Sequence, residues 1–461
     1  MTTTSIQDLS RAGAGELAQA LAEREVSTVE LADAAIERIE RLDGAINAVV
    51  VRDFDRARQA AIAADAALAR GERRPLLGVP MTVKEAFNVE GLPTTWGVPA
   101  EKPWIAAADA IGVARLKAAG AVILGKTNIP PFLADWQSVN PVYGRTNHPL
   151  DDALTPGGSS GGGAAALASG MVPLEFGSDI GGSIRVPSSF CGVYGHKPSY
   201  NLVPQRGHAP PGLDSDGVAL NVVGPMARNV ADLILALDVL AGPAGDEAVG
   251  YCLQLPAARR EHLADFRVLI IDEHPLAAVD SQIRAALTSL ASRVEAAGAK
   301  VSRKSELLPD LAASQGVYLP ILSAAMFHNT PGLGDPLGAD PLSAEAWMNA
   351  LDAQIAFRRR WSALFRAFDV VLAPAFGVVA FPHDDRPFAE RVHIIDGKET
   401  PYAAQVAWPG MATLANLPAT AVPIGKTKAG LPIGMQIIGP YLEDRTTLAF
   451  AGLVEREFGP G

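Results

Sequence analysis

The sequence is poor in cysteine and in basic charge. Its two cysteines, Cys191 and Cys252, cannot build a disulfide scaffold, and their spacing matches no zinc motif. The eight histidines include no H-E-x-x-H pair, so we expect no metal centre. Lys and Arg number 39 against 50 Asp and Glu, a net charge of -11 that excludes a basic surface for nucleic acid. We expect no nucleic-acid partner and no cofactor.

Long apolar runs are also missing. Runs such as residues 121–124 and 370–373 are far shorter than the ~20 apolar residues of a membrane-spanning helix. The first residues lack the basic segment followed by an apolar segment that is typical of a secretory signal. We therefore expect a cytoplasmic protein with no membrane contact, a small-molecule substrate, and a monomeric or homodimeric state.

The patterns that are present indicate an α/β protein. Ser27 to Glu30 form a capping box, and apolar residues then recur at helical spacing, so residues 1–70 are predicted to be mostly helical. From residue 76, short apolar runs alternate with helical stretches; the runs are 77–83, 121–124, 268–271 and 370–373, and the helices 109–119, 230–241 and 280–297. This alternation predicts an α/β/α sandwich, a sheet with helices on both faces. Residues 421–424 and 433–438 look like a hairpin, which makes the predicted sheet mixed.

Two motif matches point to functions that the context does not favour. Residues 120–127 fit the phosphate-loop pattern G-x-x-x-x-G-K-[ST], but the intervening residues are typical of a strand and Pro130-Pro131 blocks the required helix. Residues 157–161 fit the G-x-S-x-G nucleophile elbow, although residues 151–156 are a poor strand. A Ser-His-Asp site on Ser159 stays open as an alternative, because four histidines lie downstream at 274, 328, 383 and 393.

The most informative stretch carries two serine-bearing glycine loops. Residues 157–163 read Gly-Gly-Ser-Ser-Gly-Gly-Gly, residues 164–170 form a helix of small residues, and residues 179–185 read Asp-Ile-Gly-Gly-Ser-Ile-Arg. Only one short helix-strand element separates the loops, so the fold can bring them together. A flexible linker would not be followed at once by an Ala-rich helix and a second Gly-Gly-Ser.

Together these loops resemble the signatures of the amidase signature family of serine hydrolases. Further blocks that look like the family's lie at 78–84, 125–128, 140–144, 195–198 and 430–434. The resemblance implies one domain over residues 1–461, whose central sheet is large, mixed and twisted. Residues 1–70 would pack on the core, 76–200 would hold the catalytic motifs, and 201–461 would complete the sheet and the pocket loops.

The resemblance also implies residue roles. Ser183 would be the nucleophile, Ser159 a bridging serine on a cis peptide bond, and Lys84 the terminal base. The backbone N–H groups of Ile180, Gly181, Gly182 and Ser183 would form the oxyanion hole. Glycines suit this loop, because a side chain would block the close approach of N–H groups to an oxyanion.

The lysine assignment makes a physical demand. A lysine can take a proton only when it is neutral, and Lys84 ends an apolar strand, where burial disfavours the ammonium form. Lowering the pKa from about 10.4 to near 7 requires roughly 4 to 5 kcal/mol, so the site must be dry. Asp179 and Arg185 are expected to pair and stiffen the loop. Glu85 stands where the family pattern leads us to expect Asp, and on a strand it points away from Lys84.

Substrate-binding residues are inferred from their place in the resemblance. Leu133, Asp135, Trp136 and Ser160 should border the acyl pocket together with Ile180, and residues 316–341 should form a leaving-group wall. Residues 329–341 are rich in Pro and Gly and are predicted to form a mobile loop. Residues 135–138 are similar to bacterial amidases that act on hydrophobic or aryl amides, some of which also split carbamates and esters.

The sequence therefore predicts an amidase for a small-molecule amide or carbamate, acting through an acyl-enzyme. The glutamine-hydrolysing subunit of a tRNA amidotransferase, which works with a partner protein, stays an alternative. Chain length and the lack of an obvious added domain argue against it.

Overall fold

A computed structural model describes residues 11–213, 215–327 and 342–459. Its N-terminal part is mainly helical, as predicted, with α2 (Ala14–Glu23), α3 (Thr28–Ile46) and α4 (Phe54–Ala69). Ser27 caps α3 through its side chain, and the Glu30 carboxylate accepts a 2.8 Å hydrogen bond from the Ser27 N–H. The short edge strand β1 (Val49–Arg52) was not anticipated. The predicted mobile loop at 329–341 lies outside the described residues.

Within these ranges, eleven strands form one sheet in the order β1-β3-β2-β6-β8-β7-β14-β15-β11-β9-β10. The strands after β1 are β2 (Pro80–Lys84), β3 (Val122–Thr127), β6 (Leu174–Asp179), β7 (Tyr194–Lys197), β8 (Val222–Ala227), β9 (Arg267–Ile270), β10 (Lys300–Ser302), β11 (Val370–Pro374), β14 (Ala419–Lys426) and β15 (Pro432–Ile438). Two small hairpins lie apart from the sheet: β4 (Val139–Asn140) with β5 (Gly144–Arg145), and β12 (Val392–Ile395) with β13 (Lys398–Pro401).

The sheet is mixed, which confirms the prediction. Strand β2 runs parallel to β3 and β6, and β9 runs parallel to β10 and β11. Strands β14 and β15 form the predicted antiparallel hairpin. The carboxyl ends of the parallel strands β2, β3 and β6 therefore lie at the same edge of the sheet, which is where Lys84, Thr127 and Asp179 are found.

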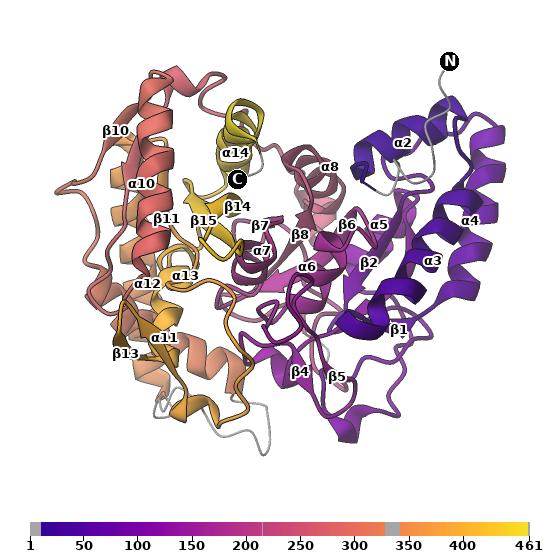
Figure 1. The fold of residues 1–461 in the computed structure, drawn as a ribbon, viewed down its shortest axis with the longest axis horizontal. Coiled ribbons are helices and arrows are strands. Elements are labelled where there is room, and N and C mark those ends of the chain that lie inside the picture. The colour runs from indigo at the N-terminus through magenta and orange to yellow at the C-terminus, as the bar shows by residue number, and fades with distance from the viewer. Residues whose placement is uncertain (1–10, 214, 328–341, 460–461) are drawn as a thin grey trace.

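Helices cover both faces of the sheet (Figure 1). Successive side chains of a strand point to opposite faces. On β6, Glu175 meets Gly163 of α6 (Gly161–Ala168), whereas Phe176 meets Gly112 of α5 (Ile111–Ala118) on the other side. The two faces are therefore both packed, and β6 is buried along its length.

The remaining helices complete the layers. They are α7 (Arg185–Cys191), α8 (Val230–Leu240), α9 (Glu247–Gly250), α10 (Ser281–Ala296), α11 (Leu311–Phe327), α12 (Ala344–Ala367), α13 (Ala407–Leu414) and α14 (Asp444–Phe458). Short 3-10 turns are η1 (Pro99–Glu101), η2 (Pro131–Leu133), η3 (Leu263–Asp265), η4 (Phe388–Glu390) and η5 (Tyr402–Val406). Figure 1 shows α3 and α4 at one end of the sheet and α10 at the other. Among the described helices, none is both long and apolar enough to cross a bilayer.

A buried polar network ties α14 to the sheet. The Asp444 carboxylate lies 3.1 Å from Nε2 of His196 on β7 and accepts hydrogen bonds from the Ser199 N–H at 2.8 Å and the Ser199 hydroxyl at 2.6 Å. His196 and Asp444 are both fully buried. Removal of the carboxylate would leave several buried donors without an acceptor, which is costly.

We therefore expect Asp444→Ala to lower the free energy of unfolding by about 3 kcal/mol or more. Urea denaturation measures this loss. The matched control is Asp238→Ala, because Asp238 pairs with Arg445 at the exposed surface and should contribute less than about 1 kcal/mol. Equal effects of the two substitutions would contradict the role given to the network.

Candidate active site

Lys84 is the last residue of β2, and its side chain is completely buried. Its Nζ lies 2.7 Å from Oγ of Ser159 and 2.9 Å from Oγ of Ser178. Lys84 stands at the carboxyl end of this central strand, and from there its amine reaches both serine loops. The contact with Ser178 was not expected from the sequence, although this residue directly precedes Asp179 in the signature.

Burial is the main influence on the amine. It lowers the pKa of Lys84 to about 7, and the negative charges of Asp179 and Glu175 oppose that fall. The value is close to the one that the proposed base requires. Near neutral pH a substantial fraction of Lys84 is therefore uncharged.

The two serine loops meet at the N-terminus of α6. The Gly158–Ser159 peptide bond is cis, as the resemblance implied. The backbone N–H of the next residue, Ser160, donates to the carbonyl of Ser183 at 3.1 Å. This bond joins the two loops at Ser183 and at the residue that follows Ser159.

The second loop is held from inside by a buried ion pair. Asp179 and Arg185 are both inaccessible, and their side chains approach to 2.8 Å. Burial raises the pKa of Asp179, but the Arg185 charge and the hydrogen bonds to the carboxylate outweigh it and lower the value to about 2. Arg185 also donates to Gln436 Oε1 at 2.7 Å and to Thr413 Oγ1 at 2.9 Å. The pair expected from the sequence is thus anchored to β15 and α13.

Asp179 also binds the loop backbone. Its carboxylate accepts from the N–H of Gly182 at 2.9 Å and of Ile184 at 3.0 Å. This differs from the expectation for Gly182, because its N–H is already engaged by the Asp179 carboxylate. The sequence could not reveal this, because a glycine loop offers several N–H groups and only the folded loop decides where each points.

Two aromatic side chains hold the other side of the loop. Tyr318 donates from its hydroxyl to the carbonyl of Ile180 at 2.7 Å, and Trp136 donates from Nε1 to the carbonyl of Gly181 at 2.8 Å. Both carbonyls are thus turned toward these donors. The N–H groups of Ile180, Gly181 and Ser183 are left as the candidate donors for an oxyanion.

A narrow cavity opens at Ser183. About 40 Å³ of it is open to the centres of water molecules, and its lining residues are Leu133, Ala134, Asp135, Trp136, Ile180, Gly181, Ser183, Leu322, Met326, Phe327, Phe388 and Val406. The lining is mostly apolar. It includes the segment expected to border the acyl pocket, and α11 contributes Leu322, Met326 and Phe327 from the predicted wall at 316–341. Residues 328–341 of that wall lie outside the described part of the chain.

Ser160 is placed differently from the expectation. It is fully buried, and its hydroxyl donates to the carbonyl of Ser178 at 3.3 Å. It is absent from the cavity lining because its side chain packs against β6 behind the loop. In this structure Ser160 supports the loops and does not contact the cavity.

Asp135 is the acidic residue of the cavity wall, and its carboxylate is paired with a cation. Arg391 lies 2.5 Å from one of its oxygens, and the Tyr402 hydroxyl donates to the other at 2.8 Å. Arg391 and Phe388 were not expected from the sequence. They lie more than 240 residues from Asp135 and carry no motif, so no local signal could have found them.

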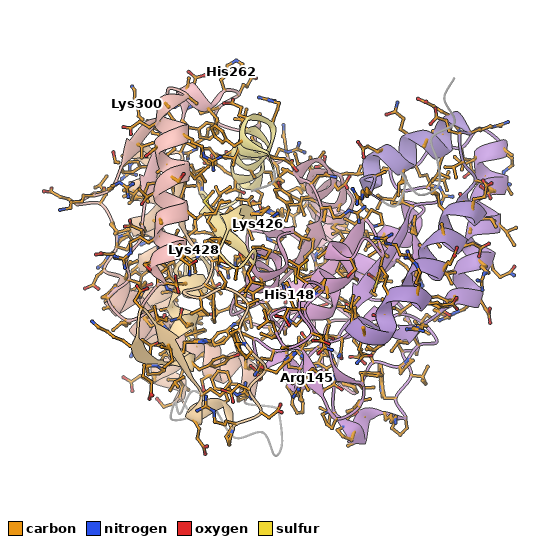
Figure 2. All side chains as sticks on the ribbon, in the orientation of Figure 1. Arg145, His148, His262, Lys300, Lys426 and Lys428 are labelled. Carbon is orange, nitrogen blue, oxygen red and sulfur yellow. The ribbon has the colours of Figure 1, made fainter. Side chains whose placement is uncertain are left out.

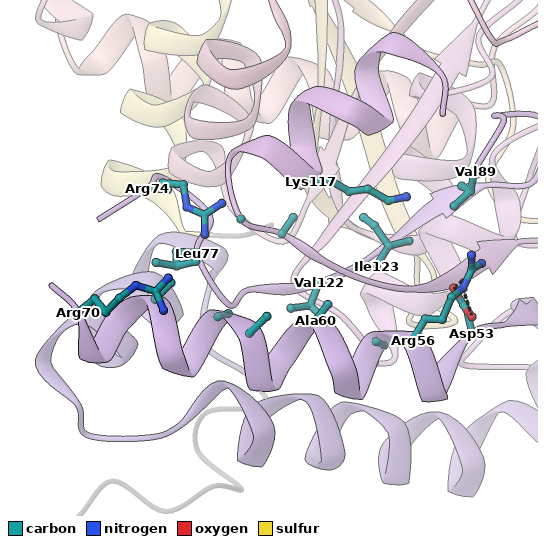
Figure 3. Close-up of a pocket in the computed structure, with 16 residues that line it drawn as sticks. Asp53, Arg56, Ala60, Arg70, Arg74, Leu77, Val89, Lys117, Val122 and Ile123 are labelled. Atoms are coloured by element: carbon teal, nitrogen blue, oxygen red, sulfur yellow. Dashed lines mark hydrogen bonds and ion pairs between the residues drawn. The ribbon is translucent and has the colours of Figure 1, made fainter. Parts of the chain in front are cut away.

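A larger cavity lies away from both serine loops, between α4 and β3 (Figure 3). It has about 460 Å³ open to the centres of water molecules. Alanines of α4 form its floor, and Arg56 at its rim pairs with Asp53 at 2.8 Å. It contains none of the site residues expected from the sequence, so size alone does not identify where the chemistry occurs.

The phosphate-loop interpretation fails in the structure. Residues 122–127 are the strand β3, and the Nζ of Lys126 is buried against the carbonyl of Pro93 and the hydroxyl of Thr94. This segment therefore offers a phosphate neither a backbone cradle nor a free lysine.

The Ser-His-Asp interpretation fails as well in the described residues. The Lys84 amine donates a hydrogen bond to Ser159, and no described histidine is hydrogen bonded to that serine. Of the expected partners, His274 packs against the Trp408 ring, His393 packs against the rings of Phe381 and Tyr402, and the backbone N–H of His383 donates to the Ala153 carbonyl. His148 lies in the packed interior and contacts the carbonyl of Phe190 at 2.9 Å, whereas His262 is exposed (Figure 2). His328 lies outside the described residues. The same residues contain no group of three metal-ligating side chains.

The chain is similar to known proteins along nearly its whole length. The Amidase family model matches residues 30–335 and 334–448. A glutamyl-tRNA(Gln) amidotransferase subunit from Anaeromyxobacter sp. (strain K) is 34% identical, over 99% of this chain and 98% of that protein. The indoleacetamide hydrolase of Bradyrhizobium diazoefficiens is 34% identical, over 96% of this chain and 86% of that protein.

The fold has close structural counterparts. A bacterial aryl acylamidase of the amidase signature family superimposes with a TM-score of 0.85 and 25% identity, over 97% of this chain and 96% of that one. Family model, relatives and structure therefore agree. The chain belongs to the amidase signature family, whose enzymes are hydrolases that act on carbon–nitrogen bonds.

Proposed function

We propose that this protein hydrolyses small hydrophobic or aryl amides through an acyl-enzyme formed on Ser183. The observation that carries the proposal is the 2.7 Å contact between the buried amine of Lys84 and Ser159, beside a cavity that Ser183 lines. Neutral Lys84 takes the proton of the Ser159 hydroxyl while Ser159 takes that of Ser183. The Ser183 oxygen then attacks the substrate carbonyl carbon.

The tetrahedral intermediate carries its negative charge on the former carbonyl oxygen. The N–H groups of Ile180, Gly181 and Ser183 would stabilise that oxygen, each such donor contributing about 3 kcal/mol in comparable sites. Protonated Lys84 returns a proton through Ser159 to the leaving nitrogen as the carbon–nitrogen bond breaks. Water then attacks the acyl-enzyme by the same proton route and releases the acid.

The cavity wall supports an apolar substrate. Aromatic and aliphatic side chains line most of it, and the Asp135 charge is matched by Arg391. Carbamates and esters pass through the same tetrahedral geometry, so urethanase and esterase activity belong to the proposal. Free glutamine, with two charges, would need charged partners that this described wall does not provide.

The glutamine-hydrolysing function of an amidotransferase stays a second candidate, on one specific observation. An amidotransferase subunit matches this chain over 98% of its own length. The argument from chain length and from a missing added domain is therefore wrong, since the two proteins have the same extent. Only substrate preference and a partner protein separate the two functions.

Replacing either end of the proton route should abolish turnover. We expect Lys84→Ala and Ser183→Ala each to lower kcat/KM for an aryl anilide by about 10³-fold or more, because members of such a unit act together. A fluorophosphonate probe should label Ser183, as located by peptide mass spectrometry. Lys117→Ala and Ser169→Ala, which alter residues outside the site, should keep wild-type rates. Labelling at Ser159 would contradict the assignment.

The pH profile follows from the state of Lys84. Below its pKa the amine is protonated and cannot accept a proton, so kcat/KM for an uncharged anilide should rise with pH through a midpoint near 7. Initial rates in buffers of constant ionic strength measure the midpoint. A rate that is independent of pH from about 5 to 8 would exclude Lys84 as the base.

Substrate preference separates the two candidate functions. The purified chain should hydrolyse aryl and arylacetic amides with kcat/KM at least about tenfold above that for glutamine, because an apolar wall cannot compensate for the loss of solvation of two charges. A panel of anilides, primary amides, aryl carbamates and glutamine tests this. A preference for glutamine would favour the amidotransferase function.

A further inference from the structure

A second buried acid lies beside the lysine strand. Glu175 on β6 is inaccessible, and β2 pairs with β6 so that Thr82 is its register partner. The Thr82 hydroxyl donates to one oxygen of Glu175 at 2.5 Å, and the Thr127 hydroxyl donates to the other at 2.7 Å. Thr127 is the register partner of Lys84 on β3. The carboxyl therefore lies on the same face of the sheet as the amine.

Helix α6 covers this carboxyl. A Cβ added to Gly163 would lie 2.5 Å from Cγ of Glu175, so the helix backbone rests directly on the side chain. Gly163 belongs to the same glycine loop and helix start that carries Ser159. One element thus seals Glu175 and presents Ser159 to Lys84.

Burial has opposite effects on the two groups. It raises the pKa of Glu175 to about 7, against the hydrogen bonds of Thr82 and Thr127 and the charge of Lys84. It lowers the pKa of Lys84 to the same range. The charge of each group favours the charged form of the other, so their two ionisations are linked.

Two other titratable groups act on or feel the charge of the lysine. Asp179 is ionised and also favours the protonated amine, more strongly than Glu175 does, but it is held in the salt bridge to Arg185 on α7. Burial, aided by the charge of Lys84, lowers the pKa of His208 to about 3, so this histidine is neutral at working pH.

The opposite face of the sheet and helix α6 place no further acid beside the amine of Lys84 among the described residues. Lys126 alternates with Thr127 on β3 and so points to the other side of the sheet, and Glu85, which follows β2, contacts the same 93–96 segment as Lys126. There Glu85 accepts hydrogen bonds from the N–H groups of Thr95 and Trp96. The sequence of α6 holds no charged residue. Of the two described acids whose charges act on Lys84, Asp179 is bound to Arg185, whereas Glu175 is hydrogen bonded to threonine hydroxyls.

We propose that Glu175 is a positioning residue that acts on the reaction through Lys84: its carboxylate favours the protonated amine and so sets the pH at which that amine becomes a base. The inference rests on the proposed function, in which neutral Lys84 begins the proton transfer. It also accounts for the contacts of Thr82 and Thr127, since their hydroxyls lower the pKa of the carboxyl and so favour its ionised form.

Glu175→Gln is the direct test, because glutamine has the same shape and can still bond both threonine hydroxyls. Without the negative charge, the protonated form of Lys84 is less favoured. The midpoint of the rise of kcat/KM with pH should therefore fall by about half a pH unit or more. The rise should also become steeper, since a single ionisation replaces a coupled pair. The pH dependence of fluorophosphonate labelling of Ser183 should show the same shift.

A second variant keeps the test decisive if that protein does not fold. Thr127→Val is isosteric and removes one donor from Glu175, which weakens its ionised form and should shift the midpoint in the same direction by a smaller amount. The matched control is Glu85→Gln, which removes an equally buried acid from the opposite face and should leave the midpoint in place.

The possible outcomes distinguish a failure of the role given to Glu175 from a failure of the proposed function. If Lys84→Ala abolishes turnover while Glu175→Gln and Thr127→Val keep the wild-type midpoint, the role of Glu175 is wrong and the proposed function stands. If Lys84→Ala retains turnover, the proposed function itself fails. A loss of rate in Glu175→Gln without any change in the pH profile would indicate a merely structural role and would overturn the proposal.

Discussion

The site depends on keeping one amine away from water. Lys84 is buried at the end of a central strand, and in the described part of the chain its side-chain partners are serine hydroxyls at 2.7 and 2.9 Å. A direct ion pair would hold the proton on the amine, whereas hydroxyl partners satisfy it without fixing its charge. The parallel packing of β2 between β3 and β6 makes this burial possible, because both faces of these strands are covered.

The same logic accounts for where the strong charges are placed. Arg185 is paired with Asp179, one residue beyond Ser178, and the pair holds the backbone of the second serine loop. Arg391 is paired with Asp135 in the cavity wall. Each of these arginines thus compensates a buried acid, and the acids whose charges act on Lys84 are Asp179 and Glu175. The same arginine–aspartate pairs therefore stiffen the loop and compensate buried negative charge.

The cavity at Ser183 is built from parts that lie far apart in the chain. The segment 133–136, the loop 180–183, helix α11 and the turn at Phe388 converge on Ser183. Two proteins that share most of the length of this chain carry different names, a glutamyl-tRNA(Gln) amidotransferase subunit and an indoleacetamide hydrolase. In this chain the cavity wall is mostly apolar.

The sequence by itself determined the layered α/β architecture, the mixed sheet, the hairpin of β14 and β15, and the membership of Lys84, Ser159 and Ser183 in one motif set. The architecture follows from local periodicity, which the chain displays directly, whereas the grouping of the three residues follows from the resemblance of several sequence blocks to the amidase signature family. Tertiary structure alone decided that the Gly182 N–H binds Asp179, that Ser160 packs behind the loop, and that Arg391 pairs with Asp135. The direction of an N–H group and the partner of a distant side chain depend on contacts between elements that only the folded chain brings together.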